Sequence, residues 1–165
     1  MSTDLRMLSG DEVVALVRTL MTVRPLLRNA PAERIIQELG WTEIEHNDEV
    51  FFTDPGDGLG EGSVGLGDDG TPEVVTASIH TQMRGRDTDE RRDFRQDAYS
   101  VAGRAITAEF GKPYALDGGH LPKLKWRIGD SAINLIRAPI GVKLWLWRPI
   151  DLKAREWIPD EEEYL

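Results

Sequence analysis

The stretch Asp54-Pro-Gly-Asp-Gly-Leu-Gly-Glu-Gly-Ser-Val-Gly-Leu-Gly-Asp-Asp-Gly70 decides between two kinds of fold. Within it, residues 60–65 spell G-x-G-x-x-G, a pattern that in dinucleotide-binding folds opens a helix whose N-terminus holds a pyrophosphate. Here a strand pattern and an Asp-Asp-Gly turn follow instead, and the flanking carboxylates would repel a phosphate. The stretch therefore predicts an acidic connection followed by an antiparallel hairpin, and it does not predict a nucleotide site.

The residues around this stretch repeat the hairpin pattern. Upstream, an alternating segment and a short apolar run flank the turn signal Asn47-Asp48. Downstream, Val75, Ala77 and Ile79 give one apolar face to a returning strand. Residues 54–60 can only form a loop, because a proline and three glycines leave little to pack. The four predicted strands cover residues 41–46, 50–52, 62–67 and 74–81.

Helices are predicted before these strands. Ser9 and Glu12 have the spacing of a capping box, and apolar residues recur at helical spacing after them until Pro25 interrupts the pattern. A second short helix is expected to start near Pro31 and to end at Gly40, which is a favourable residue just after a helix. The N-terminal part is therefore predicted to form two short helices or one broken helix.

The longest predicted helix follows the four strands. It starts after Thr88 and ends at Gly111, and a stripe rich in alanine indicates close packing on a sheet. The remaining residues alternate over 124–128, 132–137 and 142–147, which predicts three more strands. The order is α-ββββ-α-βββ, an α+β fold with N-terminal helices, one long central helix and a mainly antiparallel sheet of about six to seven strands. We expect a single domain over residues 1–165, with a short flexible N-terminus and an acidic tail at 159–165.

Composition excludes several classes of protein. The chain has 165 residues, a formal net charge of −9 and no cysteine, so disulfides and thiol chemistry are ruled out. The negative charge opposes binding to nucleic-acid phosphates and favours association with basic partners. We expect no secretion signal, and no apolar run is long enough to span a membrane. We therefore expect a cytoplasmic protein without nucleic-acid or membrane partners.

No complete catalytic or metal-binding pattern is present. The histidines at 46, 80 and 120 lie far apart and lack metal-ligand spacing, and Ser63 is not in a G-x-S-x-G motif. The carboxylates of Asp54, Asp57 and Glu61 do not have the spacing of a calcium loop. We expect no catalytic residue, no cofactor and no metal. A small enzyme stays open as an alternative, which a pocket joining His80 or His120 to carboxylates would favour.

The last strand pattern leaves one question open. Trp145 and Trp147 share a face with Lys143, while the aliphatic residues between them point to the other face. If the aliphatic face is the core, the two indoles stand on the opposite side of the sheet. Either helices cover them or they form a contact surface.

Charge is distributed unevenly along the chain. Residues 41–83 carry ten acids and no base, whereas residues 112–155 carry nine bases and three acids. The two groups either neutralise each other across neighbouring strands or leave an acidic protrusion aimed at a basic partner, with the loop 54–62 at its tip. On the second interpretation, the predicted partner-binding residues are Asp54, Asp57, Gly58, Glu61, Asp68 and Asp69.

Four short motifs carry a family resemblance over residues 9–148: Ile35-Ile-Gln-Glu-Leu-Gly-Trp41, Gly60-Glu-Gly-Ser-Val64, Glu109-Phe-Gly-Lys-Pro113 and Leu124-Lys-Trp-Arg127. With them the chain resembles a family of small uncharacterised actinobacterial proteins, which look like immunity proteins of polymorphic toxin systems. In kind they are similar to the immunity factor of the tuberculosis necrotizing toxin, an NAD glycohydrolase. The element order is also similar to that of type III secretion chaperones.

The resemblance implies a binding protein rather than an enzyme. The leading expectation is an immunity protein, or antitoxin, that blocks a cognate secreted toxin by occluding its active-site cleft, with the acidic loop entering a basic cleft. The alternative is a secretion-chaperone-like protein that binds an effector. The sequence fixes neither the toxin, nor the oligomeric state, nor the face that binds.

Overall fold

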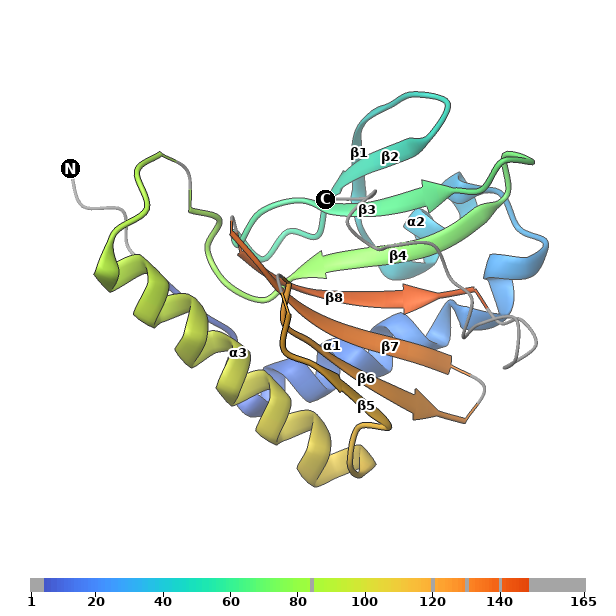
Figure 1. The fold of residues 1–165 in the computed structure, drawn as a ribbon. Helices are drawn as coiled ribbons and strands as arrows, with labels where there is room; N and C mark the ends of the chain where they lie inside the picture. Colours follow the sequence, from blue (N-terminus) through green and yellow to red (C-terminus); the bar gives the residue numbers. More distant parts are fainter. Residues whose placement is uncertain (1–4, 84, 120, 130, 140, 149–165) are drawn as a thin grey trace.

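The computed structural model describes residues 5–83, 85–119, 121–129, 131–139 and 141–148. These residues form three α-helices, one 3-10 helix and eight strands (Figure 1). The elements are α1 (Gly10–Thr22), η1 (Arg24–Arg28), α2 (Ala32–Leu39), β1 (Thr42–His46), β2 (Val50–Asp54), β3 (Gly62–Leu66), β4 (Pro72–Ser78), α3 (Asp89–Phe110), β5 (Ala115–Asp117), β6 (Lys123–Ile128), β7 (Ser131–Ala138) and β8 (Gly141–Trp147). Both ends of the chain, including the acidic tail at 159–165, lie outside the described residues.

The strands make one antiparallel sheet in the order β1-β2-β3-β4-β8-β7-β6-β5. The predicted α+β class with an antiparallel sheet is confirmed, and the seven predicted strands are present. The eighth strand, β5, was missed because it has only three residues and no alternation of its own. The last strand of the chain lies in the middle of the sheet, where Thr76 of β4 pairs with Trp145 of β8.

The helices begin and end at the residues that the sequence indicates. The capping box of Ser9 and Glu12 is present at α1, and the Thr88 hydroxyl accepts a hydrogen bond from the Arg91 backbone at α3. Gly40 ends α2 with φ of 73°, a left-handed conformation that glycine adopts without strain. Local chemistry therefore sets the helix boundaries.

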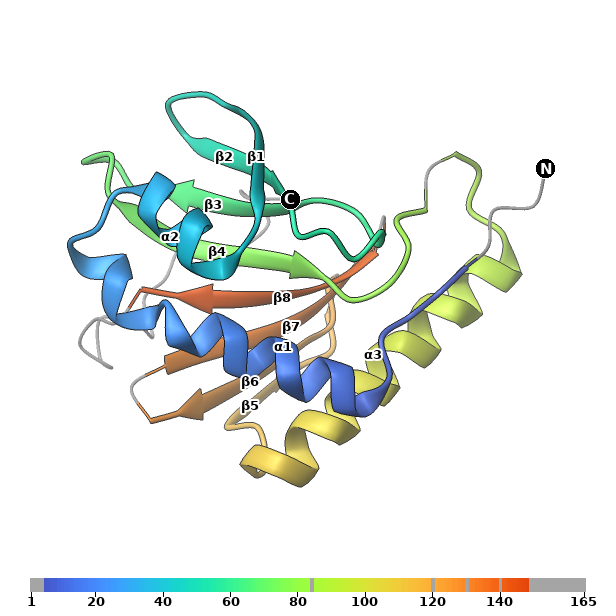
Figure 2. The ribbon, with the colours of Figure 1, turned by 180° about the vertical axis from the view of Figure 1, so that it is seen from behind.

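All three α-helices pack on one face of the sheet, which we call the inner face (Figures 1 and 2). Their apolar residues join those of the strands in a single core. Gly103 allows α3 to lie close to the sheet, because a Cβ there would stand 2.9 Å from a methyl group of Leu124. No helix in the described part of the chain is long and apolar enough to cross a membrane.

The opposite face, the outer face, carries the two tryptophans whose position was left open. Trp145 and Trp147 are each 1% exposed and belong to a second apolar cluster, separate from the main core. The described helices lie on the inner face, so they do not cover these indoles.

Candidate functional site

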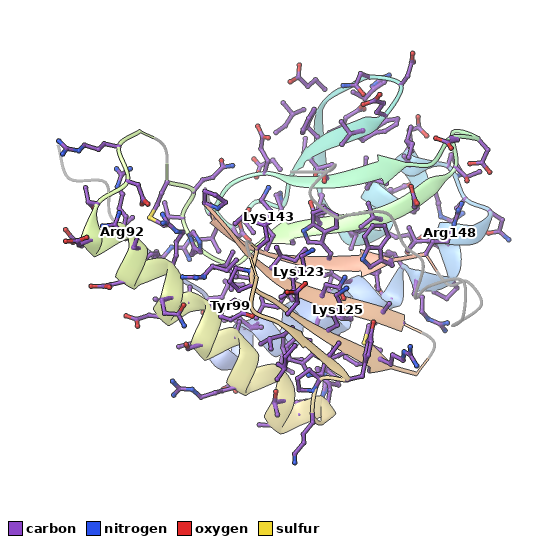
Figure 3. All side chains as sticks on the ribbon, in the orientation of Figure 1. Arg92, Tyr99, Lys123, Lys125, Lys143 and Arg148 are labelled. Atoms are coloured by element: carbon purple, nitrogen blue, oxygen red, sulfur yellow. The ribbon has the colours of Figure 1, made fainter. Side chains whose placement is uncertain are left out.

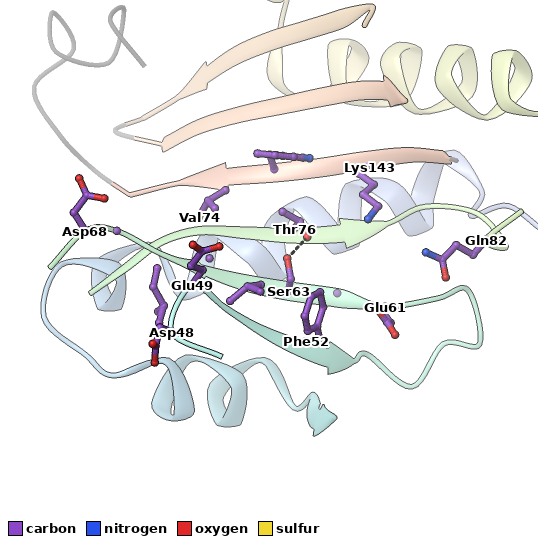
Figure 4. A pocket seen from close by; sticks show the side chains of 16 residues that line it. Asp48, Glu49, Phe52, Glu61, Ser63, Asp68, Val74, Thr76, Gln82 and Lys143 are labelled. Carbon is purple, nitrogen blue, oxygen red and sulfur yellow. Dashed lines mark hydrogen bonds between the residues drawn. The ribbon is translucent and has the colours of Figure 1, made fainter. Parts of the chain in front are cut away.

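A groove of about 780 Å³ runs across the outer face of β2, β3, β4 and β8 (Figure 4). Its floor follows one row of paired residues, in which Phe52 lies beside Ser63, Ser63 beside Thr76 and Thr76 beside Trp145. Residues paired directly across antiparallel strands project from the same face, so these four side chains stand in line. The two hydroxyls in the row are 2.6 Å apart and hydrogen-bonded.

Small residues on β3 leave the outer face of the sheet hollow, because few side chains project into the groove there. Gly65 lies between Val50 and Val74 in the neighbouring row, where it contributes no side chain. Gly62 has a different reason to be glycine, because a Cβ there would lie 2.7 Å from the Trp41 ring. The glycine-rich sequence therefore serves both the hollow on the outer face and close packing beside it.

The groove is mainly acidic. Four carboxylates and one lysine are among its lining residues: Asp48, Glu49, Glu61, Asp68 and Lys143. Asp48, Glu49 and Asp68 lie towards one end, and Glu61 and Lys143 towards the other (Figure 4). Burial lowers the pKa of Lys143, and the nearby charge of Glu61 opposes that shift.

The sheet order separates the acidic and basic parts of the sequence in space. Strands β1 to β4, from the base-free residues 41–83, form one side of the sheet, and β5 to β8 form the other. The two sides adjoin only where β4 pairs with β8. Neutralisation by neighbouring strands is therefore restricted to that one seam, and most of the acidic surface faces solvent or the groove.

The structure divides the six predicted partner-binding residues between the two ends of β3. Glu61 and Asp68 line the groove at opposite ends. Asp54 is the last residue of β2, Asp57 and Gly58 lie in the loop between β2 and β3, and none of the three lines the groove. The last of the six, Asp69, caps the turn between β3 and β4, where hydrogen bonds from the hydroxyl and, to a smaller extent, the backbone N–H of Thr71 lower its pKa.

The loop between β2 and β3 is anchored to the rest of the fold. Leu59 is buried in the main core, and its carbonyl accepts a hydrogen bond from the Gln82 backbone. The Arg6 guanidinium donates to the carbonyl of Asp57. Leu59 therefore draws this part of the loop onto the core, while Asp54, Gly56 and Gly58 are exposed.

The remaining groove residues were not identified from the sequence. Asp48 and Glu49 belong to the turn between β1 and β2, which was noted only as a turn signal. Phe52, Lys143 and Trp145 come from strands whose alternation was visible. That alternation shows which side chains share a face, but it does not show that β8 pairs with β4.

The described histidines have structural contacts. The Val142 backbone N–H donates to Nε2 of His80 at 2.8 Å, so Nδ1 carries the proton and donates to the Thr81 carbonyl at 2.7 Å. Burial lowers the pKa of His80, and its charged neighbour is Arg95 rather than a carboxylate. His46 stacks on Phe51, outside the groove lining.

No group of three or more His, Asp or Glu able to hold a metal ion occurs in the described part of the chain. His120, one of the two histidines named for a possible enzyme, lies outside it.

The chain belongs to a family of unknown function, DUF6301, whose model matches residues 11–148. Its fold is similar to the crystal structure of a DUF4309 family protein (YjgB) from Bacillus subtilis, with a TM-score of 0.53 and 10% sequence identity. The match covers 85% of this chain and 97% of that chain, and at such low identity it shows the fold alone. No curated protein matches the sequence.

Proposed function

We propose that this member of the DUF6301 family is a protein-binding protein whose groove receives a positively charged segment of a partner. The observation that carries the proposal is the lining of the groove, where four carboxylates face a single lysine. The groove lies mainly on the base-free side of the sheet. A basic segment would therefore meet attraction along most of its length.

The floor suits the side chains of such a segment. Phe52, which is half-buried, offers its ring surface to the aliphatic stems and charged ends of lysine or arginine, and the indole of Trp145 is buried beneath the floor. Asp48, Glu49 and Asp68 gather at one end, where they would pair with the positive charges. The net charge of −9 would speed the encounter with a basic partner.

We further propose that the partner is a secreted toxin and that the chain acts as its immunity protein in the producer's cytoplasm. The resemblance to immunity proteins supports this class. A toxin whose cleft takes an anionic ligand, such as an NAD glycohydrolase, would present basic residues around that cleft. Occupation of those residues by the acidic groove would block access of the ligand.

A charge-reversal experiment tests the groove. Binding of a fluorescent oligolysine peptide is measured by anisotropy for the wild-type chain and for the double variant Glu49→Lys/Asp68→Lys. We expect the double variant to bind at least about tenfold more weakly, a loss of about 1.4 kcal/mol. The matched control, Asp93→Lys/Asp97→Lys, makes the same charge change on the exposed surface of α3. Equal weakening in both variants would show that net charge, and not the groove, governs binding.

A genetic experiment tests the immunity role. The product of the adjacent gene is expressed alone and together with this chain, and growth is followed. We expect toxicity that the wild-type chain relieves and the Glu49→Lys/Asp68→Lys variant does not. If the wild-type chain does not relieve the toxicity and forms no complex with that product, the immunity role is rejected. Peptide binding by the groove is tested separately, by the anisotropy experiment.

One observation favours the chaperone-like alternative. All five residues of β1 are exposed, and this strand is the first in the sheet order. Among the described residues no further strand pairs with β1, and an edge strand of this kind can pair with an extended client segment. A stable dimer that holds a client segment along β1, and does not block an active site, would favour this function over immunity.

A further inference from the structure

Lys143 of β8 is the one cation among the described residues that line the groove. Figure 3 shows it on the outer face of the sheet, where Lys123 and Lys125 of β6 also lie. Neither of those two lysines belongs to the groove lining. The groove therefore has a single position at which it can hold a negative charge.

The surroundings of Lys143 leave room for such a charge. Ser78 of β4 pairs with Lys143, and its hydroxyl donates to the Glu61 carbonyl at 3.2 Å, so Glu61 stands one strand further away. Lys143 is half-buried, and no carboxylate of the described residues forms an ion pair with it. Taking a cation out of water costs free energy, and a bound anion offsets that cost. Burial accordingly lowers the pKa of Lys143.

Neutral hydrogen-bond donors lie near this ammonium group. The hydroxyls of Ser63 and Thr76 share one hydrogen bond at 2.6 Å, so one of the two keeps a proton that it can donate elsewhere. The side-chain amide of Gln82 lines the same end of the groove (Figure 4). An ammonium group with hydroxyl and amide donors beside it is suited to binding a carboxylate.

The groove is closed beyond Lys143 by the loop between β2 and β3. The Gln82 backbone N–H donates to the Leu59 carbonyl at 2.9 Å, and a Cβ on Gly60 would lie 3.3 Å from the Cβ of Gln82. Leu59 is buried in the main core, which holds this contact in place. A segment that continued past this end would have to turn away from the sheet, whereas a chain that terminates here needs no exit.

We propose that the groove receives the C-terminal segment of its partner, with the terminal carboxylate at Lys143 and basic side chains at the opposite end. This inference rests on the proposed function and adds the direction of the bound segment and the nature of its end. Glu61 and Asp68 are seven residues apart, which is roughly 23 Å in an extended chain. The partner therefore carries its lysines or arginines roughly five to seven residues before its last residue.

Three fluorescent heptapeptides test this inference by anisotropy. Each begins with two lysines followed by alanines. The first ends in a free carboxylate, the second ends in an amide, and the third has one internal glutamate and an amide end. We expect the free acid to bind the wild-type chain at least about fivefold more tightly than either amide. Lys143→Met should abolish this difference, and Lys112→Met, which removes an exposed lysine just after α3, should preserve it.

The possible outcomes separate this inference from the proposed function. The plain amide carries one more net positive charge than the free acid, so a groove that recognises positive charge alone would bind it at least as tightly. That result would overturn the inference and leave the proposed function standing. Equally tight binding of the glutamate peptide would also overturn it, because a side-chain carboxylate would then suffice.

Two further results complete the test. If none of the three peptides binds while oligolysine does, the inference alone fails, and if oligolysine does not bind either, the proposed function fails with it. Circular dichroism checks that the Lys143→Met variant is folded. If it is not, the comparison of the three peptides on the wild-type chain decides.

Discussion

The two halves of the outer face differ although one continuous sheet carries both. Over β2, β3 and β4 the face is hollow, and its central row offers a serine and a threonine between Phe52 and Trp145. Over β8 and β7 the same face is filled by tryptophan and isoleucine and is buried. Side-chain volume on neighbouring strands thus decides whether a sheet face becomes a binding groove or part of a core. The predictions below test this contrast, from the largest expected effect to the smallest.

Removing a large side chain should destabilise the buried half of the outer face much more than the groove half. Trp147→Ala removes a fully packed side chain, and we expect the free energy of unfolding to fall by about 3–5 kcal/mol. Phe52→Ala removes a half-buried ring at the groove and should cost less than half as much. Urea denaturation followed by circular dichroism measures both. Equal losses would mean that the groove floor is packed as tightly as the buried half.

The glycines of the groove should also divide into two kinds. Gly62→Ala places a Cβ 2.7 Å from the Trp41 ring and 3.0 Å from the Thr76 carbonyl, so we expect a loss of about 1–3 kcal/mol. Gly67→Ala meets no atom closer than 3.4 Å, and that atom belongs to the Asp69 carboxylate. It should therefore change the melting temperature much less. A similar fall in both variants would contradict the packing role of Gly62.

The seam between the halves should respond to pH through His80. Its folded-state pKa lies below the ordinary 6.5 because of burial, so the unfolded chain binds the proton more readily. The neutral His80 therefore makes its full contribution to the free energy of unfolding above pH 6.5. That contribution decreases as the pH drops from 6.5 towards the folded-state pKa. Protonation would also place an N–H against the Val142 N–H at 2.8 Å, with Arg95 nearby.

Urea midpoints at a series of pH values between 7.5 and 5 measure this effect. The slope of stability against pH should be smaller in His80→Gln than in the wild-type chain. A wild-type stability that does not fall over this range would refute the assignment.

The smallest effect concerns the lysine in the groove. Burial lowers the pKa of Lys143 from 10.5, and Glu61 partly offsets the shift, so Glu61→Gln should lower that pKa further. Because the unfolded chain holds this proton more tightly, stability should rise as the pH increases through the lowered pKa towards 10.5. NMR titration of the Lys143 side chain measures the shift. Asp57→Asn, outside the groove, is the matched control and should leave it unchanged.

Local patterns predicted most of the elements but only part of the site. The capping residues and alternation located the helices and seven strands, because those signals act within a few residues. Charge counting pointed to two residues that line the groove, Glu61 and Asp68. It placed emphasis on the loop at Asp54 and Asp57, because nothing local shows that Leu59 holds this loop against the core.

The sequence by itself determined the element types, the antiparallel character of the hairpins and the separation of acidic from basic residues along the chain. Only the tertiary structure decided that β8 enters beside β4, which brings Lys143 and Trp145 to Glu61 and Ser63. The physical reason is the range of the interactions. A cap or an alternating strand depends on near neighbours, whereas the pairing of Thr76 with Trp145 joins segments far apart in the chain. Such a pairing is selected by the apolar surface that the complete sheet buries, and no single segment carries that information.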